Sequence, residues 1–130
     1  NIMDTIVHAL ASTLNNLHAS MMACGMFVVQ DIFNVLVPSG SGQAAITMPI
    51  MAPLADMLGV TRQTAVLAFQ MGDAFTNVLA PTGGEILAAL AMCKTPYGKW
   101  VKYLLPLFVM WWIVAFIFLI YATKIGFGPF

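Results

Sequence analysis

The sequence predicts an all-α integral membrane protein, and three observations lead to this class. Of the 130 residues, 61% are hydrophobic and only 8% are charged, and the mean hydropathy is +0.90. A soluble domain carries roughly 25% charged residues, so these charges are too few to cover the surface of a soluble body. Apolar runs of helical length alternate with short polar breaks, and the run from Tyr103 to Thr123 contains no charged residue. Such a run is typical of a transmembrane helix.

The same composition argues against several other classes of function. The net charge is zero and no basic run is present, so nucleic-acid binding has no support. Cys24 and Cys93 are isolated, with no histidine near them at metal-ligand spacing, so we expect neither a disulfide framework nor a metal centre. The sequence holds no catalytic triad, carboxylate pair or phosphate-binding loop. We therefore predict that the chain is not an enzyme and carries no organic cofactor.

The first expected element is an amphipathic arm helix over residues 1–18. From residue 2 onward, apolar side chains recur at steps of three and four residues, with polar side chains between them. The segment is too polar to cross a bilayer, so we expect it to lie along the membrane surface or against another domain. Because the sequence starts without methionine and in mid-pattern, we also expect it to be the C-terminal part of a longer protein.

The second expected element is a re-entrant hairpin over residues 19–58. Residues 19–37 are apolar but end in polar side chains before Pro38, and the next apolar run, 44–55, has only 12 residues and contains two prolines. A full span needs about 20 residues, and apolar runs of about 10–14 are more often re-entrant or buried. We place the hairpin tip at residues 38–43, where serine and glycine alternate.

A discontinuous transmembrane helix is expected next, over residues 62–94. Its first part stops at Pro81 and its second part, 85–93, is short, which puts the break at residues 81–84. The final transmembrane helix is expected over residues 98–124. Before it, three lysines gather in the loop from Lys94 to Lys102. The positive-inside bias places this loop in the cytoplasm, so the hairpin opens towards the outside.

One phrase of the sequence occurs twice, once near the hairpin tip and once near the helix break. Asp31 to Gly42 reads DIFNVLVPSGSG, and Asp73 to Gly84 reads DAFTNVLAPTGG, with Thr76 as one extra residue. Proline stops each helix, and glycine lets the backbone turn sharply and approach a ligand. Because non-helical backbone inside a membrane must be buried in protein or line a wet cavity, two such breaks predict an internal site of a secondary transporter.

The helix ends at these breaks suit ions of both signs. The helices that end at the prolines present carbonyl groups, which can coordinate a cation, and the helices that follow present free N–H groups, which favour an anion. Asn34 and Asn77 each lie four residues before a proline. Their amide oxygens complete a sodium shell in one interpretation, and in the other each amide binds the carbonyls freed by the proline.

Acidic side chains supply the remaining candidates for ion coupling. Gln70, Asp73 and Asn77 share one helix face, and an aspartate inside a membrane segment is a functional-site hypothesis by default. Four interpretations of Asp73 stay open: it carries a coupling proton, it balances the charge of sodium, it binds a cationic group of the substrate, or it is a structural acid. Asp31 is a weaker candidate, because its helix could place it nearer another helix than the cavity. The spacing of Thr82 and Glu85 predicts a capping box.

The longest string of this region also carries a family resemblance. PSGSGQAAITMPIMAPLADMLGVTRQTAVLAFQ, with GDAFTNVLAPTGG and KTPYGKW, resembles the YfcC-like branch of the anaerobic four-carbon dicarboxylate carrier family, within the ion-transporter superfamily. The resemblance covers nearly the whole chain and is strongest from Pro38 to Trp100. It implies half of an inverted-repeat transporter in which hairpin tip and helix break meet face to face, and a homodimer whose transport domain moves like an elevator. Ser-Gly-Ser and Thr-Gly-Gly replace the Ser-Asn-Thr signature of many sodium–carboxylate relatives, which leaves substrate and coupling ion open.

The resulting hypothesis is a multi-pass secondary active transporter of the bacterial inner membrane. It moves a small organic anion or amino acid and uses sodium or a proton as the coupling ion, which Asn34, Asn77, Asp73 and Asp31 hold or balance. The predicted substrate-binding residues are those of the two breaks: Ser39, Gly40, Ser41, Gly42, Gln43, Pro81, Thr82, Gly83 and Gly84. Two alternatives stay open. One is a basic amino acid exchanger without ion coupling, and the other is a non-transporting membrane interaction subunit.

Overall fold

The computed structural model describes residues 18–128, and this range is all-helical, without a strand. The predicted all-α class is therefore confirmed for the described residues, whereas the predicted arm helix lies almost wholly outside them. The five helices are α2 (Ala19–Leu36), α3 (Gly40–Met57), α4 (Arg62–Asn77), α5 (Gly84–Met92) and α6 (Tyr97–Ile125).

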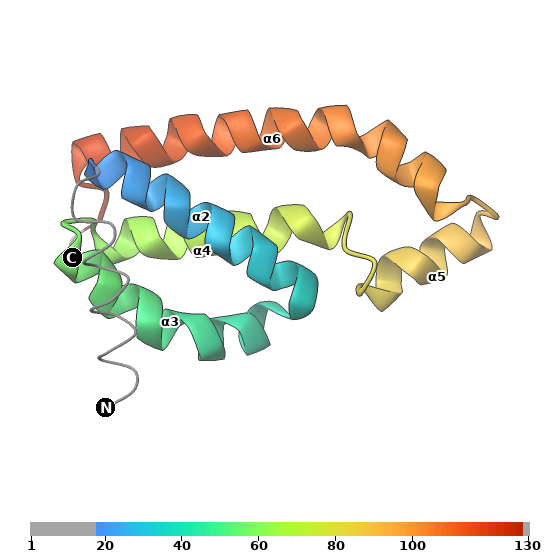
Figure 1. Cartoon of the computed structure of the whole chain (residues 1–130), viewed down its shortest axis with the longest axis horizontal. Helices are drawn as coiled ribbons and strands as arrows, with labels where there is room; N and C mark the ends of the chain where they lie inside the picture. Colours follow the sequence, from blue (N-terminus) through green and yellow to red (C-terminus); the bar gives the residue numbers. More distant parts are fainter. Residues whose placement is uncertain (1–17, 129–130) are drawn as a thin grey trace.

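Two of these helices are long and apolar enough to cross a membrane. They are α2, with 18 residues and a hydropathy of 1.5, and α6, with 29 residues and a hydropathy of 2.5. The helices α4 and α5 have 16 and 9 residues, so each is shorter than the range of roughly 17–25 residues that transmembrane helices need. In Figure 1, α6 runs along one side of the molecule, and α5 extends beyond the other short helices.

The closest helix pair is α2 and α4, which lie side by side and run in the same direction (Figure 1). Gly72 makes this approach possible. A Cβ atom at position 72 would lie 2.7 Å from the Cβ of Gln30 and 2.8 Å from the backbone nitrogen of Asp31. Because only glycine fits there, the backbones of the two helices pack directly against each other.

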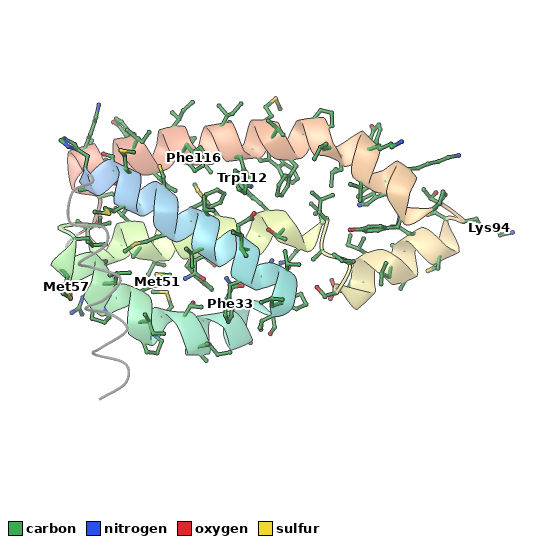
Figure 2. The ribbon with its side chains drawn as sticks, in the orientation of Figure 1. Phe33, Met51, Met57, Lys94, Trp112 and Phe116 are labelled. Atoms are coloured by element: carbon green, nitrogen blue, oxygen red, sulfur yellow. The ribbon has the colours of Figure 1, made fainter. Side chains whose placement is uncertain are left out.

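Aromatic side chains join α6 to the pair. The ring of Phe27 on α2 meets Phe75 of α4, Trp112 and Phe116 edge-on, with centroid distances of 6.0, 5.4 and 5.6 Å. Figure 2 shows Trp112 and Phe116 on the side of α6 that faces α2. Such edge-to-face contacts are the preferred geometry of aromatic pairs. Along α2 the buried stripe changes from apolar to polar towards the C-terminal end, where Gln30, Asp31 and Asn34 are buried.

The two helix interruptions differ in length from the predicted ones. The first is shorter than the tip 38–43, because α3 already begins at Gly40, where Ser39 caps it by accepting a 3.4 Å hydrogen bond from the Gly42 nitrogen. The second, residues 78–83, starts earlier than predicted because α4 ends at Asn77. Pro81 cannot donate to the carbonyl four residues before it, so the helix stops at that carbonyl.

An exposed ion pair holds the turn between α3 and α4. The Arg62 guanidinium donates from Nε to Oδ1 of Asp56 at 2.9 Å and from a terminal nitrogen to Oδ2 at 2.6 Å. These hydrogen bonds hold the pKa of the Asp56 carboxyl below its usual range. The hydroxyl of Thr61 caps the first turn of α4 by accepting from the Thr64 nitrogen at 3.2 Å. The entry of the chain into α4 is therefore fixed by its own side chains.

Candidate functional site

The two copies of the repeated phrase meet at the ends of α2 and α4. The Asn34 side-chain Nδ2 donates to Oδ1 of Asn77 at 2.8 Å and to the backbone oxygen of Asp73 at 2.6 Å. Asn34 and Asn77 are 43 residues apart, and so are Pro38 and Pro81 (81 − 38 = 43). Because the two helices are parallel, the two asparagines lie opposite each other near the two helix ends.

This arrangement places two negative helix ends next to each other. Each helix C-terminus carries roughly half a negative charge, and the like ends of parallel neighbours repel unless a positive charge lies near them. The prolines at 38 and 81 have no N–H, and the backbone oxygens of Asn34 and Asn77 accept no hydrogen bond from the described part of the chain. Two carbonyl groups therefore remain available at the paired ends.

Side-chain oxygens add to the acceptors near these ends. Oδ1 of Asn34 and Oδ1 of Asp73 are buried, and neither has a hydrogen-bond partner among residues 18–128. Leaving buried acceptors unsatisfied costs free energy. Within the same range, no three His, Cys, Asp or Glu side chains gather in a metal-binding group. The ligands available to a cation are therefore carbonyl, amide and single carboxylate oxygens.

Asp31 and Gln43 lie inside the helix bundle rather than in a cavity. Asp31 is 4% exposed, and the Thr76 hydroxyl on α4 donates to its carboxylate and, at 3.2 Å, to its backbone oxygen. Gln43 is fully buried and donates from Nε2 to the backbone and side-chain oxygens of Gln30 at 2.9 and 2.8 Å. These side chains join α2 to α4 and α3.

Asp73 lies between the bundle and the hairpin turn. It is partly exposed, and a Cβ atom at Gly40 would lie 2.8 Å from its Oδ2. The carboxylate therefore sits against the first residue of α3, where the positive end of that helix favours a negative charge. A side chain at position 40 would therefore push this carboxylate aside. The structure thus brings one predicted acid into contact with one predicted tip residue.

A pocket of about 410 Å³ opens beside the second break. The residues that line it are Pro38, Asn77, Val78, Thr82, Gly83, Gly84, Glu85 and Ile86. Four of them are predicted site residues, whereas Pro81 and residues 39–43 do not line it. Sequence reasoning missed Glu85 as a lining residue, because its spacing from Thr82 had been explained by a capping box.

The capping-box prediction is wrong. Gly83 is the N-cap of α5, and no side chain caps this helix. The Thr82 hydroxyl instead donates to the backbone oxygen of Val35 at 2.7 Å, in the last turn of α2. Because α5 begins one residue later than a capping box at Thr82 requires, the Thr82 hydroxyl does not cap α5 and instead joins the second break to α2.

The start of α5 gives the pocket a positive end. The backbone N–H groups of Gly84, Glu85 and Ile86 donate to no described residue, and the first helical bond runs from Leu87 to Gly83 at 3.3 Å. Free N–H groups at a helix N-terminus bind carboxylates and other anions. The exposed Glu85 carboxylate lies in the same wall, so the pocket offers an anion-binding end and one acidic group.

Comparison with known proteins gives the family. The model of the C4-dicarboxylate anaerobic carrier family (DcuC) matches residues 1–124. The chain belongs to this family. The resemblance seen in the sequence is thereby confirmed, and with α2 and α6 it makes the chain a membrane protein of a carrier family.

Two relatives show how much of a carrier this chain represents. An Escherichia coli (strain K12) protein named "Putative basic amino acid antiporter YfcC" is 38% identical over 127 residues, which is 98% of this chain and 25% of that protein. A Haemophilus influenzae (strain ATCC 51907 / DSM 11121 / KW20 / Rd) protein, "Uncharacterized protein", is 39% identical over 106 residues, or 82% of this chain and 21% of that protein. The chain thus spans a quarter or less of these relatives. No solved structure matches it.

Proposed function

We propose that this chain is half of the transport domain of an ion-coupled secondary active transporter for small carboxylate-bearing organic solutes. Membership of a carrier family supports a transporter. The observation that carries the finer proposal is the bond between Asn34 and Asn77, because it joins two negative helix ends beside a pocket that has a positive helix end.

In the proposed mechanism, a cation and a solute bind at opposite helix ends that share Asn77. Sodium as the cation is held by the unpaired backbone carbonyls and the amide oxygens of Asn34 and Asn77, whereas a proton is carried by the Asp73 carboxylate. The solute carboxylate binds the free N–H groups at the start of α5. Because a cation and a solute carboxylate that bind near each other attract, each ligand raises the affinity for the other, and this linkage is reciprocal.

The same proposal places the chain in a membrane. α2 and α3 form a re-entrant hairpin, α4 and α5 form one broken helix, and the loop from Lys94 to Lys102 is cytoplasmic. The full-length protein is a homodimer in a bacterial inner membrane, and its transport domain moves by an elevator mechanism. The prolines inside α3, Pro49 and Pro53, remove backbone donors from this helix, and such interruptions at membrane depth suit a hairpin arm that packs against other parts of the protein.

The test uses the intact protein in liposomes. Asn34→Ala and Asn77→Ala are expected to lose ion-driven uptake of radiolabelled dicarboxylate or amino acid, because each removes an oxygen from the paired ends. Gln70→Ala is the matched control, since it removes an exposed amide from the same helix as Asn77. Normal uptake in both asparagine variants would contradict the proposal.

A second candidate is exchange of basic amino acids without ion coupling. Glu85 in the pocket wall favours it, because an acidic group beside an anion-binding helix end suits a solute that carries both charges. The name of the Escherichia coli relative points the same way. Counterflow of arginine or ornithine in liposomes without any ion gradient would favour exchange, and Glu85→Gln should then weaken it.

A further inference from the structure

The first turn of α6 reaches back to the broken helix. The Trp100 indole Nε1 donates to the backbone oxygen of Val78 at 2.9 Å, and the Tyr97 hydroxyl donates to the backbone oxygen of Leu79. Tyr97 and Trp100 are three residues apart, so both side chains leave the same face of the helix. Nothing in the sequence places Tyr97 or Trp100 near residues 78 and 79.

These two bonds fall on the carbonyls that the break exposes. In a continuing helix, the oxygens of Asn77, Val78 and Leu79 would accept from residues 81–83. Pro81 has no N–H, and the Gly83 nitrogen donates to the Ala80 oxygen at 3.1 Å instead. The side chains of α6 thus satisfy two of the three freed carbonyls. The third, on Asn77, accepts nothing from the described residues and belongs to a residue that lines the pocket.

The same bonds hold a part of the molecule that has little other packing. Leu90 is the buried residue of α5, and α5 lies away from the α2–α4 pair in Figure 1. The chain turns at Lys94, at one end of the molecule (Figure 2), with a left-handed φ of 50°. The start of α6 then bonds through Tyr97 and Trp100 to residues 79 and 78. The segment before α5 and the segment after it are therefore joined by hydrogen bonds.

We infer that Tyr97 and Trp100 are positioning residues of the proposed site. By occupying the oxygens of Val78 and Leu79, they fix the shape of the break and leave the Asn77 oxygen as the carbonyl that faces a ligand. This inference rests on the proposed function for the identity of that ligand, but the hydrogen bonds themselves do not depend on it. Neither Tyr97 nor Trp100 lines the pocket.

The first test is hydrogen exchange of the full-length protein in detergent. Tyr97→Phe and Trp100→Phe keep an aromatic ring and remove the donor. Each is expected to speed amide exchange over residues 79–83 by roughly five- to tenfold, the effect of losing one ordinary hydrogen bond. Tyr103→Phe is the control, because Tyr103 is 80% exposed on the same helix. Unchanged exchange in the Tyr97 and Trp100 variants would overturn the inference.

The second test separates positioning from simple stabilisation. Sodium ions alone are titrated while the unfolding midpoint of each variant is followed. A positioning role weakens sodium binding, so the rise of the midpoint begins at a several-fold higher sodium concentration in the variants than in the parent protein. A midpoint that is lower at every concentration but begins to rise at the same sodium concentration would overturn positioning. If the parent protein does not respond to sodium while exchange in the variants is faster, the sodium site of the proposed function is contradicted, and the role of Tyr97 and Trp100 in holding the break is supported.

Discussion

The amide of Asn34 donates to the amide of Asn77 across the α2–α4 interface, at 2.8 Å. The two residues hold the same position in two copies of one phrase. The parallel helices place these two asparagines opposite each other, and both helices end where their prolines remove a hydrogen-bond donor. The repeated phrase therefore builds a pair of adjacent, partly negative helix ends from two separate segments.

Close packing of α2 on α4 depends on Gly72. Gly72→Ala is expected to lower the free energy of unfolding by about 1–3 kcal/mol, because its Cβ would overlap backbone atoms of α2 that cannot move aside. Gly25→Ala is the matched control: it lies exposed on α2 with nothing within 4 Å of an added Cβ, so it should be neutral or slightly stabilising. Thermal unfolding of the intact protein in detergent measures both, and equal effects would contradict the packing.

The contact between Gly40 and the Asp73 carboxylate leads to a prediction about transport. Gly40→Leu should displace that carboxylate and lower uptake by at least about tenfold, since small displacements at a functional site have large effects. Gly98→Leu adds the same side chain where nothing lies within 4 Å, and it should transport normally. If Gly40→Leu transports as well as Gly98→Leu, the chain fits a non-transporting interaction subunit better.

The Thr76 hydroxyl satisfies the buried carboxylate of Asp31. Thr76→Val keeps the shape of the side chain but leaves the carboxylate without this donor, so we expect a loss of about 1–3 kcal/mol in the free energy of unfolding. Thr76→Ser retains the hydroxyl and should lose clearly less. Chemical denaturation of the two variants distinguishes the outcomes, and a loss in Thr76→Ser as large as in Thr76→Val would assign the effect to packing instead.

The ion pair of Asp56 and Arg62 predicts a small pH effect. The pKa of the Asp56 carboxyl is lowered in the folded protein. The ion pair therefore stabilises the fold fully above the unfolded pKa of about 3.9, and this contribution disappears as the pH falls through the folded pKa. Asp56→Asn should therefore lower the unfolding midpoint slightly at pH 7 and lose this difference in strong acid. The effect is small because both side chains are exposed. A difference that grows on acidification would contradict the assignment.

The helices and their breaks were predictable because proline and apolar run length act locally. The all-α class followed from composition, and the positions of Pro38 and Pro81 located both interruptions to within a few residues. The orientation of individual side chains was not predictable. Whether Gln43 faces the pocket or the core depends on where α3 begins, and Gly40 and Ser39 set that start through a cap that the sequence pattern did not distinguish from a longer tip.

The hydrogen-bond partners of the residues at the second break were also not predictable from the sequence. Thr82 has the spacing of a capping box, but the Val35 oxygen of another helix competes for its hydroxyl. Tyr97 and Trp100 are ordinary interfacial aromatics by position, and only the return of α6 brings them to the carbonyls of Val78 and Leu79. Contacts between segments distant in the chain, unlike helix ends, carry no local signal.

The central claim, a cation at the paired ends of α2 and α4, is tested most directly by thermal unfolding of the intact protein in sodium chloride and in choline chloride at equal ionic strength. A ligand that binds only the folded state raises its stability. The account predicts a higher unfolding midpoint in sodium than in choline, and the loss of this difference in Asn77→Ala. Equal midpoints in the two salts, or a sodium effect that Asn77→Ala retains in full, would contradict it.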